Sequence, residues 1–138
     1  MRLTIKIISV LFLLISSLGA VSQDSLYIPI SEILPRYPGG EIKLREFIDS
    51  NLVYPVDAIS NQKSGRVYVF FIVEPDGTTS SHSVDGGITP SYGMNEEALR
   101  VVKLFTGFEP GTRNGKAISQ KMIIPIVFEL DEKVIEKK

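Results

Sequence analysis

The sequence GRVYVFFIVEPDG at residues 65–77 decides the fold of this chain. Its β-branched and aromatic residues lie between a glycine and an Asp-Gly turn signal, so they predict a strand rather than a helix. Successive side chains alternate across a strand, and here both faces are apolar, which is typical of a central strand. We therefore expect the core to pack on the face that presents Val67, Val69, Phe71 and Val73.

Two further strands complete the expected sheet. Pro75 ends the central strand because proline cannot donate a ladder hydrogen bond, and Asp76-Gly77 turns the chain into a second strand at residues 78–84. The last strand is expected at residues 119–130, where apolar residues again alternate. Pro125 lies in the middle of that strand, so we expect it to be an edge strand.

Helices are expected at residues 41–52, 56–62 and 96–105, where apolar residues recur at helical spacing. Asn95 is the expected N-terminal cap of the last helix. Together with the strands, these elements predict an α+β domain in which two helices pack on one face of a three-stranded antiparallel sheet. The apolar residues of the first helix are Leu44, Phe47, Ile48 and Leu52.

The N-terminal residues 1–22 follow the pattern of a secretory signal peptide, because basic residues precede a short apolar run and small residues follow it. Cleavage is expected after Ser22, with Ala20 as the alternative site. The apolar run is short for a membrane span, which needs roughly 20 residues. The expected location is therefore periplasmic or secreted, and the alternative is an inner-membrane anchor through residues 3–21.

The rest of the chain divides into three parts. Residues 23–36 form an extended lead-in, because their prolines prevent a long regular element. The domain itself spans residues 37–131, and residues 132–138 form a charged tail.

Composition argues against several kinds of function. The chain has no cysteine, so it has no disulfide, thiolate chemistry or cysteine-linked lipid. Its net charge is −1 with scattered basic residues, which argues against a nucleic-acid partner. His82 is the single histidine, so we expect no metal site and no cofactor. No nucleophile or acid–base constellation is visible, so neither an enzyme nor a small-molecule substrate is expected.

Several short motifs occur in order between Tyr37 and Leu130. They are Tyr37-Pro38-Gly39-Gly40-Glu41, Tyr54-Pro55 with Ala58, Gly65-Arg66-Val67-Tyr68-Val69 leading into Asp76-Gly77, Glu97-Ala98-Leu99, Phe108 with Pro110-Gly111 and Asn114-Gly115-Lys116, and Ile124-Pro125-Ile126 with Phe128. In this order and spacing they resemble the TonB C-terminal domain family, in the form common among Bacteroidetes-type sequences. The membrane anchor and Pro-rich spacer usual in the full energy transducer are not recognised, so the resemblance covers the transporter-binding module and not the parts that link it to a motor.

The resemblance implies a module that grips an outer-membrane TonB-dependent transporter. The last strand would pair with a short extended segment of the transporter, the TonB box, by strand addition. The resemblance also places the Tyr-Pro pair near that contact, although Tyr54 is equally expected as a helix-ending residue whose ring fills the core. The expected partner-binding residues are Tyr54, Pro55, Lys121, Ile123, Pro125 and Val127.

Two questions stay open at the level of sequence. The alternative function is a structural envelope protein that uses the same fold for self-association as a homodimer. The second question concerns the sheet face that carries Tyr68, Phe70 and Ile72, to which Ile123 and Val127 add. An apolar face of this size is expected to be covered, either by lead-in residues 26–34 or by a second copy.

Overall fold

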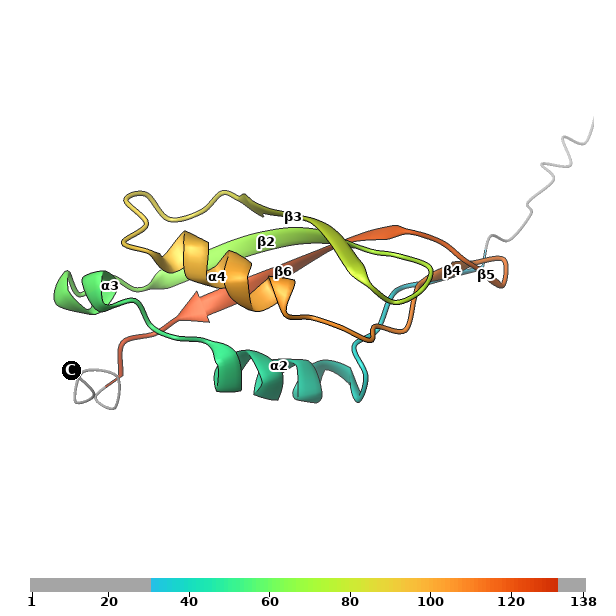
Figure 1. Cartoon of the computed structure of the whole chain (residues 1–138), viewed down its shortest axis with the longest axis horizontal. Helices are drawn as coiled ribbons and strands as arrows, with labels where there is room; N and C mark the ends of the chain where they lie inside the picture. Colours follow the sequence, from blue (N-terminus) through green and yellow to red (C-terminus); the bar gives the residue numbers. More distant parts are fainter. Residues whose placement is uncertain (1–30, 132–138) are drawn as a thin grey trace, which may run out of the picture.

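The computed structural model describes residues 31–131, which form a mixed α+β domain with three helices and two three-stranded antiparallel sheets (Figure 1). The predicted leader, lead-in residues 23–30 and the tail at 132–138 lie outside the described residues. In chain order, the elements are β1 Glu32–Ile33, α2 Gly40–Asn51, α3 Val56–Ser60, β2 Gly65–Val73, β3 Thr79–Asp85, α4 Met94–Lys103, β4 Thr112–Arg113, β5 Lys116–Ala117 and β6 Gln120–Phe128.

The larger sheet has the order β3-β2-β6, so β2 is central as predicted. A tight turn joins β2 to β3, in which the Gly77 N–H donates to the Glu74 carbonyl at 2.9 Å. Gly77 has a φ of 82°, and a β-carbon at this position would lie 2.2 Å from the Phe108 carbonyl oxygen. Glycine is therefore required both for the backbone conformation and for the close approach of the neighbouring chain.

The core lies on the predicted face of β2. Val67, Val69 and Val73 are 0% exposed and Phe71 is 1% exposed. They share one hydrophobic cluster with residues of α4 and of β6, so the face assignment is confirmed. The partners from α4 and β6 are Met94, Ala98, Val102, Ile124, Ile126 and Phe128.

The start of α4 differs from the prediction. The helix begins at Met94, and its N-terminal cap is Gly93 with a φ of 85°. Asn95 lies inside the helix, where its side chain accepts the Ile88 N–H at 2.9 Å and donates to the Ile88 carbonyl at 3.0 Å. The prediction that Asn95 caps the helix is wrong because that side chain holds the preceding loop instead.

The second sheet, β1-β4-β5, was not predicted from the sequence. The end of the lead-in pairs here, with Glu32 opposite Arg113 and Ile33 opposite Thr112. Gln120 links this sheet to β6, since its Nε2 donates to Glu32 Oε1 at 2.6 Å. Ile33 and Leu34 are 61% and 71% exposed, so residues 31–34 do not provide the first of the two alternative covers expected for the Tyr68 face. Residues 26–30 lie outside the described residues.

Candidate functional site

The free edge of β6 is the most distinctive surface of the larger sheet. All nine residues of β6 pair with β2 in an unbroken register, and within residues 31–131 no strand pairs with its other side. The opposite sheet edge, β3, is irregular, because its register to β2 shifts between Phe70 and Ile72 and Ser81 has a φ of 51°. Such a bulge blunts an edge, so β6 offers the better template for another strand.

Pro125 determines which backbone groups of β6 face outward. It lies opposite Tyr68 in the continuous ladder, and it has no N–H to donate to β2. We infer that its nitrogen lies on the free side. Because the backbone repeats every two residues, Ile123 and Val127 should also direct their N–H and C=O groups outward. The edge would then offer two donors with a gap between them.

A groove of about 2050 Å³ lies between this edge and α2. Figure 1 shows α2 running alongside β6 in the same general direction. One end of the groove is formed by residues 33–37, and the other end by residues 52–54 with Glu129. The groove-lining residues from α2 and β6 include Leu44, Ile48, Ile123, Pro125 and Val127.

The wall formed by α2 was missed as part of a site. Its apolar residues were predicted as a helix stripe, and they do pack against the core cluster. They are only partly buried, however, and no residue of α2 is fully buried. Helical spacing indicates only that an apolar stripe packs against something apolar. The sequence therefore held no signal that this stripe also lines an open groove beside β6.

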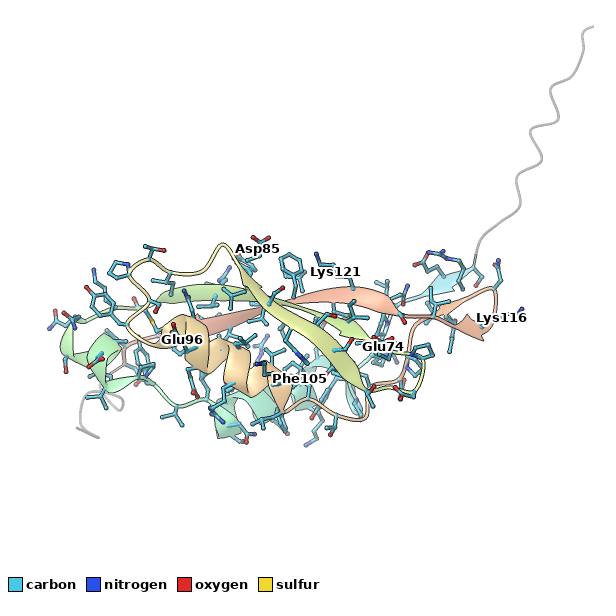
Figure 2. The ribbon with its side chains drawn as sticks, turned by 45° about the horizontal axis from the view of Figure 1, so that its top comes forward. Glu74, Asp85, Glu96, Phe105, Lys116 and Lys121 are labelled. Carbon is cyan, nitrogen blue, oxygen red and sulfur yellow. The ribbon has the colours of Figure 1, made fainter. Side chains whose placement is uncertain are left out.

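Four of the six predicted partner-binding residues line the groove: Tyr54, Ile123, Pro125 and Val127. Pro55 does not line it. It precedes α3 and lies close to Gly93, where an added β-carbon would approach the proline ring at 3.2 Å. Lys121 also lies outside the groove, and its Nζ is 4.0 Å from the centre of the Phe70 ring. Figure 2 shows Lys121 and the buried Phe105 on opposite sides of the sheet.

Tyr54 joins the core to the end of the groove. Its ring packs edge-on against Phe128 with the centroids 5.5 Å apart, and its hydroxyl donates to the Lys63 carbonyl at 2.5 Å. Burial raises the pKa of Tyr54, so the hydroxyl stays protonated and remains a donor. The ring therefore fills a core position and also borders the groove.

A charged pair on α4 holds the segment that leads from α2 to Tyr54. Glu97 Oε1 accepts the Val53 N–H at 2.7 Å, and the same carboxylate accepts two bonds from the Arg100 guanidinium. Arg100 Nη2 also donates to the Asn51 carbonyl at 2.7 Å, at the C-terminal end of α2. These bonds fix the position of Tyr54 relative to the sheet.

The pKa of Glu97 reflects two opposing effects. Burial raises it, but the hydrogen bonds from Arg100 and from the Val53 N–H, with the charge of Arg100, outweigh burial and hold the pKa below its ordinary value. A carboxylate with a lowered pKa stabilises the fold above its ordinary pKa. That contribution is lost as the pH falls through the lowered value.

Glu97→Ala should therefore lower the free energy of unfolding at neutral pH by about 1.5–3 kcal/mol, the usual effect of losing hydrogen bonds to a charged group. Glu96→Ala is the matched control; it lies on the exposed side of the same helix turn and should cost less than about 0.5 kcal/mol. The excess cost of Glu97→Ala should shrink as the pH falls below about 4. Urea denaturation at several pH values measures both, and a pH-independent difference would contradict the assignment.

His82 has a packing environment. Its ring stacks on Phe71 at 6.3 Å and its Nε2 lies 3.0 Å from Thr79 Oγ1. Burial lowers the pKa of His82, with a smaller effect from Lys103. Within the described part of the chain, no group of three or more potential ligands could hold a metal ion. No helix among residues 31–131 has the length and hydropathy to cross a membrane.

Comparison with known proteins gives one family. The model of the C-terminal domain of the Gram-negative bacterial TonB protein matches residues 50–130, from the end of α2 through β6. No curated protein matches the chain. The matched region contains the β6 edge and Tyr54, and it makes up more than half of the sequence. The chain therefore belongs to the TonB C-terminal domain family.

Proposed function

We propose that this domain captures an extended segment of an outer-membrane transporter by adding it as a strand to the free edge of β6. The chain carries a TonB-like, protein-interacting domain of a non-catalytic family. Members of that family typically bind outer-membrane transporters, and the family suggests a periplasmic or envelope location. The observation that supports strand addition most directly is the unbroken pairing of β6 on one side only, within the described residues. A free edge presents unpaired backbone groups to another strand.

The proposed roles follow from position. Ile123 and Val127 would exchange backbone hydrogen bonds with the captured segment, and Pro125 would accept through its carbonyl alone. Tyr54 would contact a side chain of the segment at the C-terminal end of β6. Pro55 would position Tyr54 at the start of α3, and Lys121 with Pro125 would limit aggregation of the edge.

The arrangement of the helices supports the same site. We take α2 and α4 to cover one face of the larger sheet, because Phe47 of α2 lies 5.7 Å from Phe105, which follows α4 in the core. This arrangement leaves the edge of β6 facing the groove. We further propose that residues 1–22 are an export leader and that residues 37–131 act in the periplasm.

The expected affinity is modest. Each backbone hydrogen bond contributes only about 0.5–1.5 kcal/mol net. Ordering a flexible segment opposes much of that gain, so we expect dissociation constants in the micromolar range or weaker. Selectivity would come from side-chain contacts in the groove, since backbone pairing is nearly independent of sequence.

Titration of the isotope-labelled full chain with synthetic peptides from transporter N-terminal segments tests the proposal. Backbone amide shifts should follow β6, with the largest effects at Ile123 and Val127, and extend to Tyr54. Shifts confined to other parts of the domain would contradict strand addition. Concentration-dependent shifts along β6 without any peptide would instead support self-association through this edge.

A further inference from the structure

The groove-facing row of α2 has a spacing that suits an extended chain. Leu44 and Ile48 of α2, with Leu52 at the C-terminal cap of that helix, occur at every fourth position and line the groove opposite β6. Residues four apart on a helix lie about 6 Å apart along its axis. Alternate side chains of a strand lie roughly 6.6 Å apart on one face. Three successive same-face side chains of a strand would therefore each meet one residue of the row.

The row and the edge of β6 form one continuous surface. Both line the same groove, and the free backbone of β6 requires an extended occupant if its groups are to be paired. Glu41, Arg45 and Asp49 also line the groove and occur at the same four-residue interval beside the row. An apolar side chain of the occupant fits the row itself, because Leu44, Ile48 and Leu52 carry no polar side-chain group that could replace the hydration of a charged one.

We propose that α2 is the second wall of the strand site and that it selects segments with apolar side chains at alternate positions. This inference rests on the proposed function and adds the chemistry of the partner: an extended segment whose every second residue, facing α2, is apolar. Leu44, Ile48 and Leu52 contact those side chains. The Glu97–Arg100 pair positions the row, because it holds the C-terminal end of α2 against α4.

Two nine-residue peptides of identical composition test the selectivity. Each contains three valines and six threonines. One has valine at the third, fifth and seventh positions, and the other has valine at the second, fifth and eighth. Valine and threonine have similar shapes and both favour strands, so the peptides differ mainly in how many valines can face α2 together. The alternating peptide should bind about tenfold more tightly, because two more valines meet the row.

Two variants of α2 locate the effect. Ile48→Ser should weaken binding of the alternating peptide about tenfold and remove most of the preference between the peptides. Ile42→Ser is the matched control, because Ile42 lies on the same helix, is 75% exposed and does not line the groove. It should change the affinity less than twofold. Thermal unfolding checks that both variants are folded, and Leu44→Ser repeats the test if Ile48→Ser is not.

The outcomes distinguish failure of this inference about α2 from failure of the proposed strand addition. Equal binding of the two peptides, or equal effects of Ile48→Ser and Ile42→Ser, with amide shifts still following β6, would overturn the role of α2 and leave strand addition standing. If neither peptide shifts the β6 amides at its highest soluble concentration, strand addition is overturned, and the role of α2 with it.

Discussion

Phe71→Ala is expected to lower the free energy of unfolding by about 3–5 kcal/mol, the range typical of removing a buried aromatic ring. Phe71 is 1% exposed in the middle of the core. Its ring lies 5.8 Å from that of Phe105 and 5.7 Å from that of Phe108. Those two rings come from the segment after α4, so they cannot both move into the space without displacing that segment from β2. The cavity should therefore persist.

Phe70→Ala is the matched control, because it makes the same chemical change one residue earlier on the opposite face of β2. Phe70 is half-buried, and its main described contact is the Lys121 ammonium over the ring. Loss of that contact and of the partial burial should cost about 1 kcal/mol. Urea denaturation of the full-length variants measures both values. Equal losses would show that the two faces of β2 contribute alike, against the burial pattern.

The alternation of β2 and β6 could be predicted because burial on one face imposes a two-residue period on the sequence. The core face of β2 and the edge position of β6 both followed from that period and from Pro125. The start of α4 could not be predicted, because both Gly93 and Asn95 could serve as its N-terminal cap. Asparagine is a favoured cap, but Gly93 adopts the left-handed conformation, and Asn95 bonds to a loop seven residues earlier in the chain.

In the smaller sheet only β4 and β5 have a local signature, because they pair across the two-residue turn Asn114-Gly115. Strand β1 has none, because it is two residues long and pairs with β4 from the other end of the domain. Glu32 meets Arg113, and the bonds of Glu32 to Arg113 and Gln120 exist only once the chain has folded. The candidate site shows the same division. Its edge was predictable from the proline, whereas the groove needs the position of α2 relative to β6, which no residue pattern specifies.

Val127→Pro is expected to weaken capture of an extended peptide about tenfold or more while the fold is retained. If the Val127 N–H points outward, proline removes one donor from the edge and places its ring where the incoming strand would lie. Val127 is 39% exposed, so the core loses little. Val127→Ala should change the affinity less than threefold, because it keeps the backbone donor. Isothermal titration with the peptides described above measures both variants.

Ile126→Pro supplies the opposite case on the neighbouring residue. If the outward groups belong to Ile123 and Val127, the Ile126 N–H faces β2, and Ile126 is itself 0% exposed. Proline there should break a ladder bond and empty the core, costing about 3 kcal/mol or more of stability. Equal stability of the two proline variants would contradict the orientation inferred from Pro125. Wild-type affinity in a folded Val127→Pro variant would instead show that the captured segment does not pair with β6 at this position. The contact would then lie toward the Met122 end of the strand or away from this edge.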